Sequence, residues 1–244
     1  MDPAPGDRAD FFAEKSSLRC QSRSVPVWYW RFRYLSGKLN HDQHGRTDAG
    51  KDLALSGGAG AKVADTKILL LRGVNVAGAN RLPMAEFREM LAEFGLKNVD
   101  THVQSGNAVF VDPGVADLEG KINKAMLQRF GFKPALFVIS LAQFKAVLKA
   151  NPYKAQGAAD GDKVHIVFLA EPAKAVDLPG LRAFAREGED VTVTDAAIYL
   201  HTPAGFGKSA LADKLQRFIN VPQTARNQRS AESILALAEA VPVS

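Results

Sequence analysis

The sequence predicts an α+β protein of two ferredoxin-like (βαββαβ) units in tandem, preceded by a disordered N-terminal lead. Two observations predict this fold. Apolar runs of strand length and helical apolar stripes follow one another in the order strand, helix, strand, strand, helix, strand, and that order then begins a second time. We expect the first unit at residues 66–140, a connecting helix and loop at 141–162, and the second unit with a C-terminal helix at 163–244.

The lead, residues 1–65, has no sustained hydrophobic period and is rich in turn-forming and charged residues. Our interpretation is that it lies outside the native protein and that translation starts near Val63. Within it, VPVWYWRFRYL (25–35) interleaves aromatic residues with arginines, as would an arm that contacts a membrane surface or RNA. Eleven residues without a helical moment are too little to support either reading.

The elements of the first unit follow in order. The run KILLLRGV (67–74) is typical of a buried strand, and Pro83 begins a helix that Gly95 ends as a left-handed cap. Two short strands follow, joined across Ser105 and Gly106. A second helix ends at Gly131. The predicted later strands are VDTHVQ (99–104), NAVFV (107–111) and KPALFVIS (133–140).

Ser140 is the predicted cap of the connecting helix, and NPYKAQGAADGD (151–162) is the predicted loop after it. The second unit repeats the order of elements less regularly. Its last helix is expected to be capped by Ser230. The other predicted elements are the strands KVHIVFLA (163–170), EDVTVT (189–194) and AAIYLHT (196–202), a short helix near 179–185, a helix over Lys208–Ile219 and the extended piece QTARN (223–227).

Composition narrows the function classes. No apolar run approaches the roughly 18 residues of a membrane span, and the start of the chain is unlike a secretory signal, so we expect a cytoplasmic protein. Cys20 is the single cysteine, and the histidines have no acidic or cysteine residues at ligand spacing, so neither a metal nor another cofactor is expected. Residues 66–244 carry 21 Lys and Arg against 18 Asp and Glu, which is weak support for nucleic-acid binding.

Three polar segments interrupt the apolar elements, and we expect them to form a pocket for a small anionic ligand or nucleotide. They are RGVNVAGAN (72–80), QSGN (104–107) and TARN (224–227). Guanidinium groups suit a carboxylate or phosphate, and amides add donors and acceptors. The candidate ligand-binding residues are Arg72, Asn75, Gln104, Ser105, Asn107, Arg226 and Asn227.

Other readings of these segments stay open. Asn75, Gly106 and Asn107 fit a purely local turn role as well as a ligand role, because turn residues often bond nearby backbone. A cofactor-free enzyme would use the same cluster with Ser105 or His102, and no catalytic residue can be assigned between them. A nucleic-acid-binding protein is a third alternative. It would show a continuous basic face, and its RNA-recognition form would need stacking aromatics that the strands lack.

The segment TPAGFGKSAL (202–211) resembles a phosphate-binding loop only in its Gly-Lys-Ser triplet. The first glycine of that motif should stand five residues before Gly207, where this chain has Thr202. The turn is therefore too short to wrap a triphosphate. We interpret it as a structural turn first, with Lys208 as a candidate contact for a single anion.

The chain resembles the bacterial "domain of unknown function 1697" family over roughly residues 66–240. The motifs that carry the resemblance are LLLRGVNVAG (69–78), Met84, THVQSGNAVF (101–110), Asn151-Pro152, IYLHTPAGFGKSAL (198–211) and TARN (224–227). The resemblance implies two ferredoxin-like halves and no particular reaction. The two similar sheets predicted from the pattern suggest a duplication. The chain departs from the family's usual Thr-Thr-Arg-Asn-Trp at Ala225 and Gln228, and it has Lys208 where Arg is common.

Overall fold

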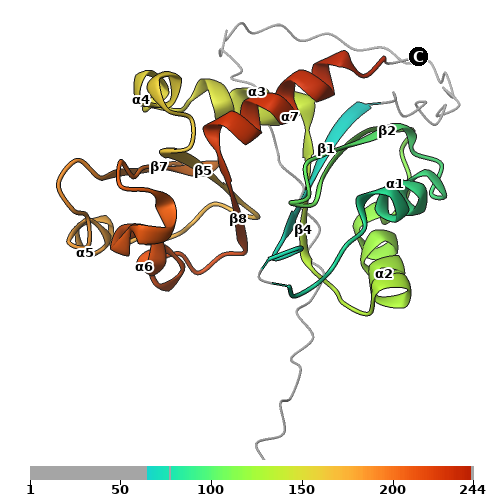
Figure 1. The fold of residues 1–244 in the computed structure, drawn as a ribbon, viewed down its shortest axis with the longest axis horizontal. Coiled ribbons are helices and arrows are strands. Elements are labelled where there is room, and N and C mark those ends of the chain that lie inside the picture. The colour runs from blue at the N-terminus through green and yellow to red at the C-terminus, as the bar shows by residue number, and fades with distance from the viewer. Residues whose placement is uncertain (1–64, 77, 243–244) are drawn as a thin grey trace, which may run out of the picture. The chain divides into compact units, whose positions relative to one another are not determined.

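The structure is a computed structural model that describes residues 65–76 and 78–242 (Figure 1). The predicted lead, apart from Asp65, and the start of translation proposed near Val63 lie outside the described residues. The α+β class is confirmed, because the described chain forms two four-stranded antiparallel sheets with helices packed on them.

The first sheet has the strand order β2-β3-β1-β4. Its helices α1 and α2 lie on one face (Figure 1), where Leu69 and Leu71 of β1 pack with Phe87 and Ile122. These apolar contacts hold the helices to the sheet. The elements are β1 (Asp65–Arg72), α1 (Met84–Ala92), β2 (Lys97–His102), β3 (Asn107–Asp112), α2 (Leu118–Phe130) and β4 (Ala135–Ser140).

The second sheet has the strand order β6-β7-β5-β8. Helices α5 and α6 pack on one of its faces, around Val167, Leu200 and Leu211. The edge strand β8 pairs only with β5 in the described chain, from His165 opposite Asn227 to Leu169 opposite Gln223. The elements are β5 (Val164–Leu169), α5 (Leu178–Arg182), β6 (Asp190–Val193), β7 (Ala197–His201), the 3-10 turn η1 (Phe206–Lys208), α6 (Ala210–Phe218) and β8 (Gln223–Asn227).

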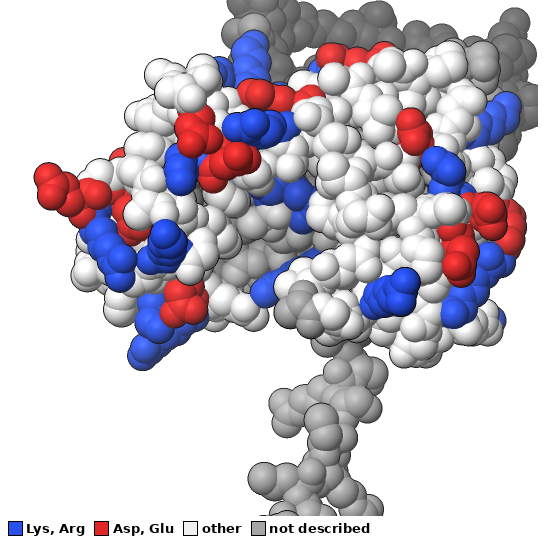
Figure 2. Space-filling view, in the orientation of Figure 1, with Lys and Arg blue, Asp and Glu red and all other residues white. Residues whose placement is uncertain are grey.

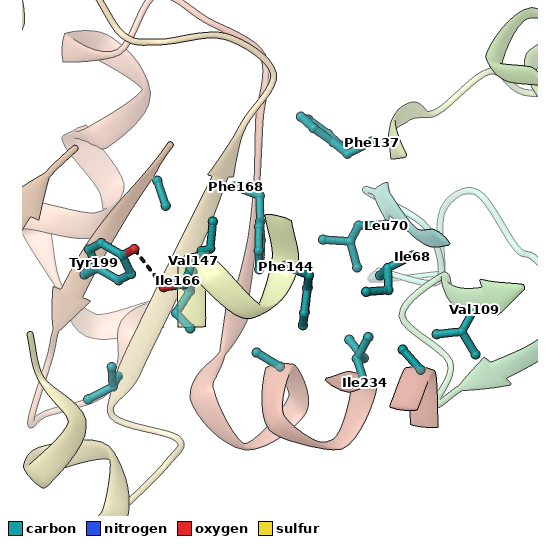
Figure 3. Close-up of a cluster of buried hydrophobic side chains, with 14 of the residues drawn as sticks. Ile68, Leu70, Val109, Phe137, Phe144, Val147, Ile166, Phe168, Tyr199 and Ile234 are labelled. Carbon is teal, nitrogen blue, oxygen red and sulfur yellow. Dashed lines mark hydrogen bonds between the residues drawn. The ribbon is translucent and has the colours of Figure 1, made fainter. Parts of the chain in front are cut away.

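A third apolar core joins the two halves (Figure 3). Successive residues of a strand face opposite sides, so Ile68 and Leu70 point away from α1 and α2 and enter this core. Ile166 does the same from β5. Helices α3 (Leu141–Lys149) and α7 (Gln228–Ala240) complete it, and the Tyr199 hydroxyl donates to the Val147 carbonyl at 2.8 Å. Both central strands are therefore buried on both faces, which explains their uninterrupted apolar runs.

Several sequence predictions about element ends are confirmed. Ser140 forms a capping box with Gln143 at the start of α3. Gly131 is the left-handed C-cap of α2, with φ 77°, as predicted. Gly95 is left-handed too, with φ 79°, but the C-cap of α1 is Glu93, two residues earlier. Among the described residues, no helix is long and apolar enough to cross a membrane.

Further predictions are wrong in detail, among them the second strand, which spans Lys97–His102 rather than 99–104. The expected loop 151–162 contains helix α4 (Lys154–Ala159), because its Ala-rich KAQGAA segment favours a helical turn. Pro83 is the N-cap of α1 rather than its first helical residue. Helix α6 starts after its cap Ser209, since Phe206–Lys208 form the separate turn η1. The cap of α7 is Asn227 and not Ser230.

Candidate functional site

Arg226 lies between the two sheets, and every N–H of its guanidinium donates to an acceptor of the protein. Nε donates to Asn107 Oδ1 at 2.6 Å. Nη1 donates to Thr224 Oγ1 at 3.0 Å and to the Ala225 carbonyl at 2.8 Å. Nη2 donates to the carbonyls of Leu71 at 2.8 Å and Ser105 at 3.2 Å. The side chain thus ties β8 to the end of β1 and to the corner between β2 and β3. We call these residues the Arg226 cluster.

The corner that receives Arg226 depends on Gly106. This glycine has φ +71°, and a Cβ built on it would lie 2.6 Å from Val74 Cγ2 and 2.8 Å from Leu71 Cβ. Its carbonyl accepts from the Leu71 N–H at 2.8 Å. The corner therefore packs directly on the end of β1 only because the residue has no side chain.

The Arg226 cluster buries a positive charge. The side chain is 8% exposed, and burial lowers the pKa of Arg226 to about 10. The guanidinium is still protonated at neutral pH. No carboxylate of the described residues pairs with it, so its charge is offset by carbonyl, amide and hydroxyl dipoles.

The first polar segment meets the same corner through Asn75. Its Nδ2 donates to the carbonyls of Leu82 at 3.0 Å and Gln104 at 2.7 Å, and its Oδ1 accepts from the Leu82 N–H at 2.8 Å. Asn75 has φ 53°, so it both takes the left-handed conformation and ties the loop to the corner. Both N–H groups of the Asn75 side-chain amide therefore donate to acceptors within the protein. The Gln104 side chain is exposed beside it.

Arg72 differs from Arg226 because it is exposed and keeps free donors. Nη1 donates to the Gln223 carbonyl at 3.2 Å and Nη2 to Gln216 Oε1 at 2.8 Å. These contacts use two of the five N–H groups of a guanidinium. Since Gln216 and Gln223 lie on α6 and β8, Arg72 reaches from the first half of the protein to the second.

Arg72 borders a pocket of about 240 Å³ at this junction. Figure 2 shows a hollow between the two halves with Lys or Arg side chains inside it. We call the cavity the junction pocket. Its lining residues are Arg72, Val167, Phe206, Ala212, Asp213, Leu215, Gln216, Gln223, Thr224 and Ala225.

Three features of the junction pocket bear on its chemistry. Thr224 connects it to the Arg226 cluster, because its hydroxyl accepts from Arg226. Gln223 is only 5% exposed, and its Oε1 has no hydrogen-bond partner among the described residues. Asp213 is the acidic residue of the lining, and its carboxylate lies 2.8 Å from Lys214 Nζ.

An aromatic pair supports the wall formed by η1. Phe206 stacks on His165 with ring centroids 4.1 Å apart. Burial lowers the pKa of His165 to about 4, partly offset by the charge of Asp162, so the imidazole is neutral at pH 7. Neutral His165 therefore acts as a flat packing partner for Phe206 and adds no charge to the pocket.

Another pocket, of about 290 Å³, lies between α3, α4 and α7. Its polar side chains bond to one another: Asn151 Nδ2 donates to Gln228 Oε1 at 3.0 Å, and Gln228 Nε2 donates to Glu232 Oε1 at 2.7 Å. Lys154 also lines this pocket and has no partner among the described residues, but the pocket has no guanidinium that hydrogen bonds hold in place, as they hold Arg72. We therefore place the candidate site at the junction pocket.

The structure brings together six of the predicted site residues. Asn75, Gln104, Ser105, Asn107 and Arg226 meet around the hairpin corner, and Arg72 lies beside them at the junction pocket. Asn227 lies apart, because it donates to Asp162 at 2.7 Å and caps α7. Lys208 is exposed on η1 and does not line the pocket. Sequence reasoning missed Phe206, Gln216 and Gln223.

The described chain does not bring together the residues that a serine nucleophile or a metal site would need. Ser105 Oγ accepts from Asn107 Nδ2 at 2.8 Å, and His102 contributes its carbonyl rather than its imidazole to the same amide. The serine is therefore not paired with a base. The described residues also contain no group of three His, Cys, Asp or Glu side chains that could hold a metal ion.

Comparisons with known proteins give a family and a fold. Residues 65–199 match the family described as "Protein of unknown function (DUF1697)". The chain is similar to the solved structure of "conserved bacterial protein SP0830 from Streptococcus pneumoniae", at 24% identity and a TM-score of 0.55, over 72% of this chain and 99% of that one. At this identity the similarity shows the fold alone. No curated protein matches the chain. Because the family match spans more than half of its residues, the chain belongs to the DUF1697 family.

Proposed function

We propose that the protein is a binding module for a small anionic ligand, which it holds in the junction pocket against Arg72. The observation that carries this proposal is the state of the Arg72 guanidinium, which is fixed by two hydrogen bonds and keeps three donors for a ligand. Gln216 and the Gln223 carbonyl hold the group in place before any ligand arrives. A preorganised guanidinium suits a carboxylate or a phosphate, which it can bind through two parallel hydrogen bonds.

The surroundings of Arg72 favour a negative charge. The cluster around Arg226 adds a second, buried cation without a carboxylate partner, and Thr224 links it to the pocket wall. Asp213 opposes this field, but its charge is offset by the neighbouring Lys214. Two guanidinium groups against one carboxylate at the pocket favour an anionic ligand.

The size of the pocket favours a small metabolite over a nucleotide. Pockets for drug-sized ligands and cofactors span about 300–1,000 Å³, and the junction pocket has about 240 Å³. Acidic and basic side chains are interspersed on the face in Figure 2, which also fits a small ligand better than a long polyanion.

We also propose that the two halves are ferredoxin-like units related by duplication. The strand orders β2-β3-β1-β4 and β6-β7-β5-β8 are equivalent when the second set is renumbered, which supports the proposal. Each sheet also carries two helices between its strands in the same sequence order, α1 and α2 or α5 and α6. In this arrangement the junction pocket lies where the end of one unit meets the edge strand of the other.

The test is a screen of phosphate- and carboxylate-bearing metabolites by thermal shift, followed by calorimetry on every hit. A ligand present at 100 times its Kd stabilises a protein by about 2.7 kcal/mol, so binding will be visible as a raised melting temperature. We expect Arg72→Gln to weaken binding at least tenfold, since a charged hydrogen bond contributes about 1.5–3 kcal/mol.

Arg88→Gln is the matched control. Arg88 lies on α1, and its ion pair with Asp100 is long, at 3.8 Å, and half exposed. This substitution removes the same charge outside the pocket and should leave affinity unchanged. A screen without hits, or equal losses in the two variants, would contradict the proposal.

A further inference from the structure

We propose that the ligand of the junction pocket is a monocarboxylate with a flat apolar body, whose carboxylate binds Arg72 and whose body packs toward Phe206. Arylalkanoic acids are the simplest members of this class. The inference rests on the proposed function and specifies the ligand class. It follows from the order in which charged and apolar side chains succeed one another along the pocket.

Arg72 forms the charged end of the junction pocket. Its guanidinium bonds Gln216 on α6 and the Gln223 carbonyl on β8, so it spans the gap between the helix and the edge strand. Of the described residues that line the pocket, Arg72 is the only Lys or Arg. One anionic group is therefore matched at this end of the pocket.

Small apolar side chains follow beside the charged end. Ala212 precedes Gln216 by about one helical turn, and Ala225 comes two residues after Gln223, so each alanine lies on the same face of its element as that glutamine. This spacing displaces them by about 6–7 Å from the two groups that hold the guanidinium. Both alanines are partly buried, and Val167, which pairs with Ala225, lies buried beneath them. Their short side chains leave room for the body of a ligand on an apolar base.

Phe206 forms the far end of the pocket. It stacks on His165, which pairs with Asn227 of β8, two residues beyond Ala225. The turn η1 that carries Phe206 also comes just before α6, so helix and strand lead in the same direction from Arg72 to this ring. Because His165 is neutral at pH 7, the far end offers an aromatic ring and no positive charge. A flat apolar group fits this end.

The lining also disfavours a second negative charge on the ligand. Asp213 adjoins Ala212 and is the acidic residue of the lining, and no second cation lines the pocket among the described residues. A dicarboxylate bound to Arg72 would bring its other carboxylate to a surface without a matching donor group. Like charges repel, so the carboxylate of Asp213 adds to this preference for a monoanion.

The experiment compares three acids, 3-phenylpropionate, propionate and glutarate, by NMR titration of the full chain. The first adds a ring to propionate, and the last adds a second carboxylate. We expect the wild-type protein to bind 3-phenylpropionate at least about tenfold more tightly than either of the others, because the ring leaves water for an apolar surface. In Ala212→Leu, the larger side chain occupies the space for the ring. The preference over propionate should fall below about threefold, with the affinity for propionate retained.

Ala236→Leu is the matched control, since Ala236 is exposed on α7 and should leave the preference unchanged. Equal binding of 3-phenylpropionate and propionate, with both lost in Arg72→Gln, would overturn this inference and leave the proposed function standing. A preference for the aromatic acid that persists in Arg72→Gln would also overturn it. If none of the three acids binds, the inference fails, and the metabolite screen tests the proposed function independently. The wild-type comparison decides the matter even if Ala212→Leu does not fold.

Discussion

At the scale of single residues, the two arginines of the site have opposite roles. Arg226 is buried and donates all five N–H groups to the protein, whereas Arg72 is exposed and donates two. In the sequence they look alike, since each is an Arg near the end of a predicted extended segment. Only the long-range contacts separate them: the acceptor at Leu71 lies 155 positions from Arg226. We therefore assign a structural role to Arg226 and a ligand-binding role to Arg72.

This assignment makes Arg226→Lys a test of stability. Lysine keeps the charge but has three donors for five acceptors, so at least two buried acceptors lose their partner. At about 1–3 kcal/mol for each of two unsatisfied groups, we expect the free energy of unfolding to fall by about 2–6 kcal/mol in urea denaturation.

Arg229→Lys is the control for the same substitution. Its side chain is 66% exposed and contacts Asp160 and Asp162 at the surface, so the change should stay below about 0.5 kcal/mol. A similar loss in the two variants would show that the buried network around Arg226 contributes little to stability.

At the scale of elements, β8 is both the edge strand of its sheet and a wall of the junction pocket. Gln223 and Ala225 are two residues apart, so their carbonyls point to the same side of the strand. Arg72 Nη1 donates to the Gln223 carbonyl, and Arg226 Nη1 donates to the Ala225 carbonyl. Unpaired groups on an edge strand invite association with other chains, and the two arginines shield this edge.

The sequence predicts these elements well where the signal is local. Apolar periodicity identifies the strands and most helices, and Ser140 and Gly131 mark the ends of elements as expected. The local signal is ambiguous at α7, where both Asn227 and Ser230 are good caps. The structure selects Asn227, because its Oδ1 accepts from the Ser230 N–H at 2.8 Å and so places Ser230 three residues inside the helix.

Asn227→Ala is therefore expected to lower the free energy of unfolding by about 1 kcal/mol through loss of the cap. Ser230→Ala should change it by less than about 0.5 kcal/mol. Because Asn227 contacts Asp162 and not the junction pocket, anion affinity should stay at the wild-type value. A loss of affinity in Asn227→Ala without a loss of stability would show that Asn227 takes part in ligand binding.

At the scale of the whole molecule, the junction pocket depends on the way the two halves meet. The shared core of Ile68, Leu70, Ile166 and residues of α3 and α7 fixes β1 against β8, and that contact places Arg72 beside Gln223. The sequence indicates two similar units and a set of polar segments. It contains no signal for Phe206, Gln216 or Gln223, because their role arises only from packing between segments far apart in the chain.

The most direct test of a binding site at this junction is an amide ¹H–¹⁵N NMR titration of the full chain with glycerol 3-phosphate. We expect the largest chemical-shift changes at Arg72, at residues 206–216 and at residues 223–225, which surround the junction pocket. The same titration of Arg72→Gln should show these changes strongly reduced. Largest changes around Asn151 and Gln228, or on the outer faces of α1 and α2, would contradict the central claim, as would no change at all.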